Sequence, residues 1–321
     1  MLDLRVFGLL LALFVGIASW FVTCAAWQFD EVAAGVMPLD PREFEGFTVV
    51  TAGTGGAYEN HHRHGPATVV GLGSSVLLVD AGRGVAEALR QATIPVSQPD
   101  TVLLTHLLPE NTLGLDDLLV MGWIDGRREP VTLLGPPGTV ALARAVEASV
   151  HGGVEAWRNA LATEGAPRFD AQEIADGWSA ALGGVAVSAG ALAGGPTPAL
   201  AYRFEARGRV AVVSGTGWGA DALTAFAKGA NLLVHQAVMV PTPEEAEELG
   251  IDADPELLRR EARLFTTFEQ AGTIARRADA DSLVLVRLRP PPVFDLQVTM
   301  LVDDHYDGSI HVADDGDEWV P

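Results

Sequence analysis

Short apolar runs alternate with amphipathic stretches along most of the chain, beginning near residue 47. Runs rich in Val, Leu and Thr that end at Gly-containing turns predict strands, at Phe47–Ala52, Ala67–Val79, Thr101–Thr105, Val131–Leu134, Val185–Ser188, Leu200–Glu205, Arg209–Ser214, Leu232–His235 and Ser282–Leu288. Longer stretches with helical periodicity predict helices, at Val85–Ala92, Leu113–Met121, Thr139–Val150, Ala220–Lys228 and Pro255–Ala278. Because strands recur with helices, the pattern predicts layered α/β packing. The acidic stretches Glu244–Asp254 and Asp314–Glu318 are predicted to be solvated surface.

An uncharged, apolar segment precedes this body. No charged residue occurs from Val6 to Trp27, and as a helix this segment would span roughly 33 Å, about the thickness of the hydrocarbon core of a bilayer. Trp20 and Trp27 lie toward its far end, where indole rings favour the membrane interface. Arg5 precedes the segment and acidic residues follow it, which places the N-terminus inside and the body outside. We therefore expect a single N-terminal transmembrane helix.

Two alternatives remain open for this segment. Cys24-Ala25-Ala26 is small enough for a signal peptidase, and the segment could also be a buried core helix. Both the anchor and the cleaved signal place the body outside the cytoplasm, in a periplasmic or extracellular location. The expected organisation is an anchor or signal peptide at 1–28, a linker at 29–46 and a globular domain at 47–321.

Charge and cysteine content narrow the class of protein. The chain has 321 residues, and its 42 acidic and 21 basic residues give a formal net charge of −21. Phosphate backbones are bound by basic surfaces, so nucleic acid is not an expected partner. Cys24 is the single cysteine, which excludes an internal disulfide framework and a zinc site built from cysteines.

A series of short motifs follows a recognisable order through the body. The motifs are Gly53-Thr54-Gly55, His64-Gly65-Pro66-Ala67, Leu78-Val79-Asp80-Ala81-Gly82, Leu104-Thr105-His106, Val213-Ser214-Gly215, Leu233-Val234-His235 and Glu269-Gln270-Ala271-Gly272. This order resembles the metallo-β-lactamase fold, in particular its ribonuclease Z-like and arylsulfatase-like branch. The resemblance covers essentially everything after the N-terminal segment. It implies an α/β domain built as a four-layer αββα sandwich, with two mixed sheets facing each other and helices outside.

The same resemblance implies a metal centre. Members of the family bind one or two metal ions, usually zinc, through a His-x-His-x-Asp-His loop, a later histidine, a bridging aspartate and a final histidine. A water between the two ions is activated as the nucleophile. The substrates of such relatives are esters, sulfates or phosphodiesters.

This chain departs from the family pattern in the metal-binding loop. The loop reads His106-Leu107-Leu108-Pro109-Glu110-Asn111, in which only His106 matches. Leu108 offers no lone pair to a metal. Glu110 replaces the aspartate with a longer carboxylate, and Asn111 is a weak neutral ligand.

The later ligand positions are changed as well. The region of the later histidine, Ser188–Gly195, contains no histidine. Thr216 stands at the place of the bridging aspartate, and Arg287 stands at the place of the final histidine. Catalytic zinc sites normally have three protein ligands, so the pattern predicts that the dimetal site is lost and that no metal cofactor is bound. The guanidinium of Arg287 adds positive charge where two dications would lie, and could replace them electrostatically.

Other side chains offer alternatives for chemistry. His62, His64 and His106 could form an altered mononuclear metal site, since alternate residues of an extended segment point the same way. His62 and His64 are otherwise interpreted as members of a polar loop, where they are solvated, pair with acids or bind an anion. Asp80 and Arg83 are expected to shape a tight turn and a nearby hydrogen-bond network.

The candidates for catalysis are His106, Glu110 and His235. Glu110 could act as a general base if burial raised its pKa. His235-Gln236 stands where relatives carry a His-Glu pair, and without that carboxylate the charged form of the imidazole is less favoured. His235 is therefore interpreted as a structural remnant.

Three functions remain open at this point. The first is a membrane-tethered, metal-free pseudoenzyme that binds a small molecule or a protein partner. Its expected pocket is formed by His62, His64, His106, Leu108, Asn111, Thr216 and Arg287. The second is an active hydrolase that acts on an ester, sulfate or phosphodiester through the altered mononuclear site, with zinc as cofactor. The third is a structural subunit of a membrane complex.

Overall fold

The computed structural model describes residues 13–26, 38–57, 62–161, 164–215, 217–248, 250, 252–289 and 295–321. The chain divides into two compact units, Met1–Leu39 and Asp40–Pro321. The first strand of the second unit starts at Phe44, three residues before the expected start of the globular domain at residue 47.

Within the first unit the structure describes a helix over residues 13–26. Its large apolar side chains, among them Phe14, Trp20 and Phe21, are exposed. Among the residues described, no helix is both long enough and apolar enough to cross a membrane. The predicted anchor covers 1–28, so its two ends lie outside the described residues and the anchor stays a prediction.

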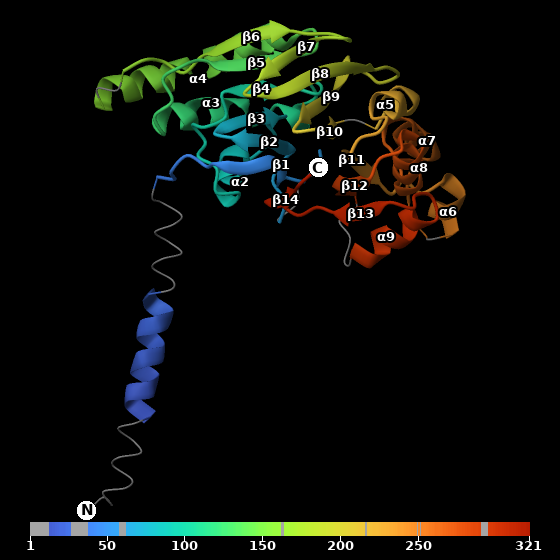
Figure 1. Ribbon diagram of the computed structural model, residues 1–321, viewed down its shortest axis with the longest axis horizontal. Coiled ribbons are helices and arrows are strands. Elements are labelled where there is room, and N and C mark those ends of the chain that lie inside the picture. The colour runs from blue at the N-terminus through green and yellow to red at the C-terminus, as the bar shows by residue number, and fades with distance from the viewer. Residues whose placement is uncertain are drawn as a thin grey trace, which may run out of the picture. The chain divides into compact units, whose positions relative to one another are not determined.

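Seven strands of the described chain form the first sheet, in the order β14-β1-β2-β3-β4-β5-β6 (Figure 1). They are β1 (Phe44–Gly53), β2 (Ala67–Gly73), β3 (Ser75–Val79), β4 (Thr101–Leu103), β5 (Val131–Gly135), β6 (Phe169–Glu173) and β14 (Asp317–Trp319). Pairing is antiparallel from β14 to β3 and parallel from β3 to β6. The first sheet is therefore mixed.

The second sheet repeats this arrangement, in the order β13-β12-β11-β10-β9-β8-β7. Its strands are β7 (Ser179–Leu182), β8 (Val185–Leu192), β9 (Ala199–Ala206), β10 (Arg209–Ser214), β11 (Leu232–Val238), β12 (Ser282–Arg289) and β13 (Ser309–Val312). Pairing is parallel from β13 to β10 and antiparallel from β10 to β7.

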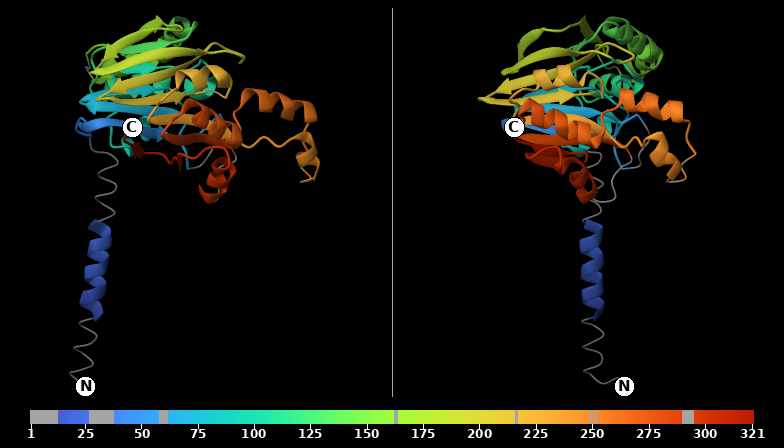
Figure 2. Two further views of the ribbon diagram at one scale, coloured as in Figure 1. Left: turned by 45° about the vertical axis from the view of Figure 1, so that its right-hand side comes forward. Right: turned by 90° about the vertical axis from the view of Figure 1, so that its right-hand side faces the viewer.

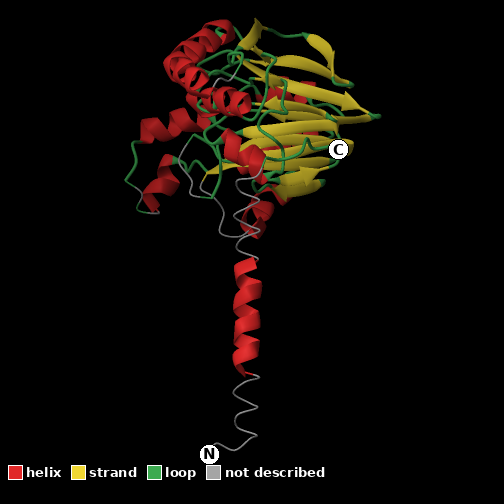
Figure 3. Ribbon diagram, turned by 90° about the vertical axis from the view of Figure 1, so that its left-hand side faces the viewer, coloured by secondary structure: helices red, strands yellow, loops and turns green. Residues whose placement is uncertain are grey.

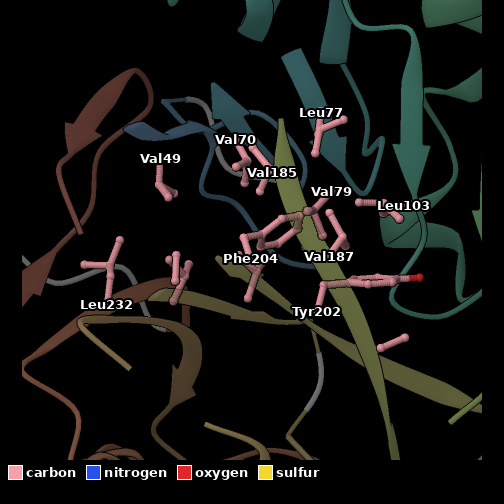
Figure 4. Close-up of a cluster of buried hydrophobic side chains, with 14 of the residues drawn as sticks. Val49, Val70, Leu77, Val79, Leu103, Val185, Val187, Tyr202, Phe204 and Leu232 are labelled. Carbon is pink, nitrogen blue, oxygen red and sulfur yellow. The ribbon is translucent and has the colours of Figure 1, made fainter. Parts of the chain in front are cut away.

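The two sheets pack face to face through apolar side chains from both of them (Figure 4). Leu77 and Leu103 come from the first sheet, whereas Val187, Tyr202 and Phe204 come from the second, and all are buried. Alternate residues of a strand point to opposite faces, so each strand also presents apolar side chains to the outside of the sandwich. Those outer faces need a second covering layer.

Helices provide that covering layer at the periphery of the strands (Figure 3). They are α2 (Val85–Gln91), the 3₁₀ helix η1 (Pro109–Asn111), α3 (Leu115–Ile124), α4 (Thr139–Leu161), α5 (Ala220–Phe226), α6 (Pro243–Glu248), α7 (Pro255–Leu264), α8 (Phe268–Ala278) and α9 (Asp295–Asp303). Apolar residues of α2, α3 and α4 pack on the first sheet, and those of α5, α8 and α9 pack on the second. Helices α6 and α7 extend away from the sheets (Figure 2). The predicted α/β sandwich with two mixed sheets is confirmed.

The C-terminal region differs from the sequence prediction. The acidic stretch Asp314–Glu318, predicted to be solvated, contributes to β14 and buries the side chain of Asp315, which is 3% exposed. Asp315 Oδ1 accepts hydrogen bonds from the main-chain N and Oγ1 of Thr54, at 2.8 and 2.6 Å. These donors replace the water that an exposed carboxylate would bind, so this acidic residue is part of the packed structure.

Candidate functional site

Three polar side chains and one main-chain carbonyl meet where parallel strands of the two sheets end. Asp80 follows β3 and Thr105 follows β4 in the first sheet, whereas Gly215 follows β10 and Arg287 lies near the end of β12 in the second. In open α/β sheets, ligand sites lie outside the carboxyl ends of the strands. These residues and Asn111, which bonds to Arg287, form the strand-end cluster, and this cluster is the candidate site.

The guanidinium of Arg287 lies at the centre of the cluster. Its Nη2 donates to Asp80 Oδ2 at 2.7 Å. Its Nη1 donates to Asn111 Oδ1 at 2.9 Å and to the carbonyl oxygen of Gly215 at 2.6 Å. The side chains of Arg287 and Asp80 are 8% and 1% exposed. A buried charge needs both a counter-charge and hydrogen bonds, and this arrangement provides them for Arg287.

The main chain of Arg287 has an unusual conformation. Its φ is 57°, within an otherwise extended strand. Its N–H donates to the carbonyl oxygen of Thr54, at 2.7 Å, in the loop that follows β1. A residue larger than glycine adopts this conformation only where surrounding contacts hold it. Arg287 therefore joins the two sheets through its main chain and its side chain.

Asp80 is held on its other side by Thr105. The N–H of Thr105 donates to Asp80 Oδ1 at 2.8 Å, and its hydroxyl donates to Oδ2, also at 2.8 Å. The φ of Asp80 is 61°, a conformation that aspartate tolerates better than most residues. Burial raises the pKa of the Asp80 carboxyl, whereas the charge of Arg287 and the Thr105 donors act in the opposite direction.

Gly215 leaves the space that the cluster occupies. A Cβ atom at this position would overlap Thr105 Oγ1 and would lie 3.1 Å from Arg287 Nη2. The absence of a side chain lets the Gly215 carbonyl approach the guanidinium. The motif Val213-Ser214-Gly215 thus serves the cluster by close approach of its backbone.

His106 lies beside the guanidinium and is neutral. Its Nδ1 accepts the Leu108 N–H at 3.2 Å, so its Nε2–H is the atom that donates to the Gly215 carbonyl oxygen at 3.1 Å. Burial, and then the charge of Arg287, lower the pKa of His106 from 6.5 to about 3. Both ring nitrogens are therefore used by the main chain.

His235 is a second neutral histidine, within β11. Thr266 Oγ1 donates to the Gly217 carbonyl oxygen at 3.0 Å, so it accepts the Nε2–H of His235 at 3.1 Å. Among the described residues, no group bonds to the buried Nδ1 of His235. Burial, and then the charge of Arg287, lower the pKa of His235 from 6.5 to about 3.

His64 contacts Asp315, and not the histidines with which it could have formed a metal site. Its main-chain N and its Nδ1 contact Asp315 Oδ2 at 2.6 and 2.9 Å. Arg63, the preceding residue, donates to Thr54 Oγ1 at 2.6 Å and to Asp314 at 2.6 Å. The His64 segment is thus tied to the C-terminal residues, and this matches the interpretation in which a loop histidine pairs with an acid.

The remaining sequence candidates occupy separate environments. His62 is exposed, and Leu108 is half-buried against the helices that cover the second sheet. Glu110 lies half-buried in η1. Thr216 lies outside the described residues. Of the expected pocket, the structure therefore brings His106, Asn111 and Arg287 together.

Sequence reasoning placed Asp80 in a hydrogen-bond network but did not identify its partner. It also left Thr105 and the Gly215 carbonyl out of the site. One signal was available, because Asp80 and Arg287 are opposite charges at the ends of two apolar runs, Leu77–Val79 and Leu283–Val286. Charges in buried strands are rare unless they are paired.

The donor set does not fit the metal centre that the family resemblance implies. Among the described residues, no group of three or more His, Cys, Asp or Glu side chains is placed to hold a metal ion. The Asp80 carboxylate and both nitrogens of His106 already have protein partners. Arg287 carries donors and a positive charge, so it repels a dication instead of binding one.

Comparisons with known proteins agree with the fold and the order of motifs. No family model matches the chain. Ribonuclease Z from Mycobacterium sp. (strain KMS) is 29% identical over 248 residues, which cover 76% of this chain and 84% of that protein. Ribonuclease Z from Mycolicibacterium gilvum is 28% identical over 277 residues, which cover 83% and 93%.

Solved structures show the same architecture. The metallo-β-lactamase fold protein YhfI from Bacillus subtilis matches with a TM-score of 0.66 and 16% identity, over 85% of this chain and 98% of that one. The short form of human tRNase Z matches with a TM-score of 0.58 and 20% identity, again over 85% and 98%. The chain thus has the metallo-β-lactamase fold and, over most of its length, is a distant homologue of ribonuclease Z.

Proposed function

We propose that this protein is a non-catalytic member of the ribonuclease Z-like family that binds a ligand or a protein partner without metal. The strand-end cluster carries the proposal. Arg287 stands at the place of the final metal-binding histidine, and its guanidinium bonds to Asn111, which stands at the last histidine of the loop. A positive side chain thus occupies the acceptor oxygens around the site.

The chemistry of the two neutral histidines supports the same conclusion. Hydrolysis in this fold depends on a water made nucleophilic by bound cations. Here the charge beside His106 and His235 is the guanidinium of Arg287, which is neutralised by Asp80. Gln236 follows His235 and supplies no carboxylate to stabilise a charged imidazole. The strand-end cluster is therefore suited to a non-catalytic role, because its charges are paired with each other.

The net negative charge of the chain argues against RNA as the partner. The relatives are named as ribonucleases, but this chain has a formal net charge of −21. A strongly acidic protein repels an RNA backbone over the range of the Debye length. The proposal therefore assigns the binding function to a small molecule or a protein, and not to RNA.

Metal analysis of the purified full chain tests the proposal directly. After incubation with zinc, we expect less than about a tenth of an equivalent of zinc, iron or manganese, because one imidazole is too few ligands. We expect no hydrolysis of a phosphodiester, an ester or a tRNA substrate above the buffer rate. Elemental mass spectrometry and a mycobacterial ribonuclease Z assayed in parallel provide the measurement and the positive control.

The His106→Ala variant is the matched control for this experiment. Close to one equivalent of metal in the wild type, lost in the variant, would contradict the proposal. That result would instead support an active hydrolase with an altered mononuclear site that includes His106. Equal, low metal content in both proteins supports the metal-free function.

We also propose that the N-terminal segment anchors the domain to a membrane, with the domain on the extracytoplasmic side. The uncharged stretch from Val6 to Trp27 supports this, because it is long enough for a bilayer as a continuous helix. The helix over residues 13–26 also leaves Phe14 and Phe21 exposed, 69% and 63%. Exposed apolar side chains on this scale are typical of segments that bind a membrane or another protein.

Membrane fractionation tests the anchor. The full chain is expected to stay in the membrane pellet after alkaline carbonate extraction. The Phe14→Arg/Ile17→Arg variant is expected in the soluble fraction, because each arginine at the centre of a span costs about 2.5–3.5 kcal/mol. The Phe14→Leu/Ile17→Leu variant keeps the hydrophobicity and is expected to remain in the pellet. A measured mass that corresponds to a mature chain starting near Ala25 would instead identify a cleaved signal peptide.

A further inference from the structure

The strand-end cluster presents three oxygen acceptors to one cation. They are Asp80 Oδ2 at 2.7 Å, Asn111 Oδ1 at 2.9 Å and the Gly215 carbonyl oxygen at 2.6 Å from the guanidinium nitrogens of Arg287. The acceptors come from three separate segments: the residue after β3, the 3₁₀ helix η1 and the residue after β10. They therefore form a cage that closes only when a cation joins them.

The shape of the cage matches a planar guanidinium. Nη1 and Nη2 of Arg287 bond to different acceptors, as the fork of donors in a guanidinium allows. An ammonium is a compact charge that cannot reproduce this fork. Zinc prefers nitrogen and sulfur ligands, but the nearby His106 Nδ1 already accepts the Leu108 N–H.

The backbone around the cage is arranged for the same occupant. Both members of the ion pair, Asp80 and Arg287, have left-handed φ values, 61° and 57°. Gly215 lacks the Cβ that would lie 3.1 Å from Arg287 Nη2. Such conformations persist only where surrounding contacts hold them, and the ion pair is a contact that both residues share.

We infer that the strand-end cluster is a guanidinium-selective cation site, and that Arg287 is its tethered occupant, holding the two sheets together where the family's other members place metal. The site binds a free guanidinium ion when the side chain of Arg287 is removed. This inference does not depend on what the protein binds at its surface. It can hold even if metal analysis overturns the proposed function.

Chemical rescue of the full-length Arg287→Gly variant tests the inference. Glycine accepts a φ of 57° without strain, so the variant removes only the side chain. Its melting temperature is expected to fall by about 6–10 °C, as for other broken buried pairs. Guanidinium or methylguanidinium at millimolar concentration, far below denaturing levels, is expected to restore about half of that loss in a saturable manner.

Matched controls separate specific binding from general salt effects. The same concentrations of sodium chloride, urea and zinc chloride are expected to leave the melting temperature of the variant unchanged. Arg289→Ala removes an arginine two positions further along the strand, where Arg289 pairs with Glu261 at 2.9 Å and is 24% exposed. Guanidinium is expected to stabilise neither this variant nor the wild type.

Two outcomes would overturn the inference. One is an Arg287→Gly variant that folds and gains no stability from guanidinium, and the other is stronger stabilisation by zinc than by guanidinium. If Arg287→Gly does not fold, Arg287→Lys keeps the charge and removes the fork. Its melting temperature is expected to lie clearly below that of the wild type, and equality with the wild type would overturn the selectivity for guanidinium.

Discussion

Replacing Asp80 by asparagine is expected to lower the free energy of unfolding by about 3–5 kcal/mol, because the guanidinium of Arg287 then stays buried without a counter-charge. Asparagine tolerates the φ of 61° at this position and has the size of aspartate, so the substitution removes the charge and one acceptor oxygen without changing the volume of the side chain. Urea unfolding followed by tryptophan fluorescence measures the loss. An unchanged m-value would show that the folded state keeps its compactness.

A double-mutant cycle provides the control for this prediction. Arg287→Met alone leaves the Asp80 carboxylate buried and unpaired, and is expected to destabilise the protein to a similar extent. The combined Asp80→Asn/Arg287→Met variant leaves neither charge. Its loss of stability is expected to be smaller than the sum of the two single losses, by about 1–3 kcal/mol. Strict additivity would falsify the claim that Asp80 and Arg287 act as a pair.

The stability of the protein is expected to fall as the pH drops below about 6.5, the pKa of an unperturbed histidine. His106 and His235 have pKa values of about 3 in the folded protein, so between about pH 6.5 and pH 3 the unfolded state binds more protons. At pH 5 each histidine lowers the free energy of unfolding by about 2 kcal/mol, which makes about 4 kcal/mol for the two. Above about pH 6.5 both histidines are neutral in the folded and in the unfolded state, so this loss of stability is absent. Burial raises the pKa of Asp80, which acts in the opposite sense.

Urea unfolding at pH 7 and at pH 5 measures this effect. The His106→Gln/His235→Gln variant keeps a hydrogen-bond donor at the end of each side chain but cannot take up a proton in the unfolded state. Its stability is expected to change less between the two pH values than that of the wild type. A variant with the same pH dependence as the wild type would show that other groups dominate.

The central strands were predictable from sequence because they are buried on both faces. β10, β11 and β12 consist mostly of Val, Leu and Ala, and each was predicted within a few residues of its ends. The edge strands β6 and β7 were not predicted, because their residues are largely exposed and form no apolar run. Strands at an edge receive only part of their stability from burial, so their sequences need fewer apolar residues.

Local sequence also gave the wrong end for one helix. The helix was predicted over Thr139–Val150, and Gly152 and Gly153, which disfavour a helix, follow it in the sequence. α4 continues through both glycines to Leu161. Val154 is buried, so tertiary packing outweighs the local cost of the glycines.

The candidate site was predictable in part. The family resemblance placed Asn111 and Arg287 at ligand positions, and the structure brings them into contact. The pairing of Arg287 with Asp80 joins residues 207 positions apart, which no local pattern encodes. The left-handed backbone at Arg287 was equally out of reach, since it is imposed by contacts with Thr54 and the cage and is not preferred by arginine.

The pairing of β14 with β1 has a consequence for synthesis of the protein. β1 begins at Phe44 and its partner β14 ends at Trp319, so the first sheet needs both ends of the domain. A chain that is still being synthesised therefore exposes the edge of β1 until β14 has emerged from the ribosome. In that interval Thr54 also lacks the Asp315 carboxylate that accepts its hydrogen bonds. The sheet is therefore completed late, and until β14 pairs with it the open edge of β1 is a site for wrong pairing with another chain.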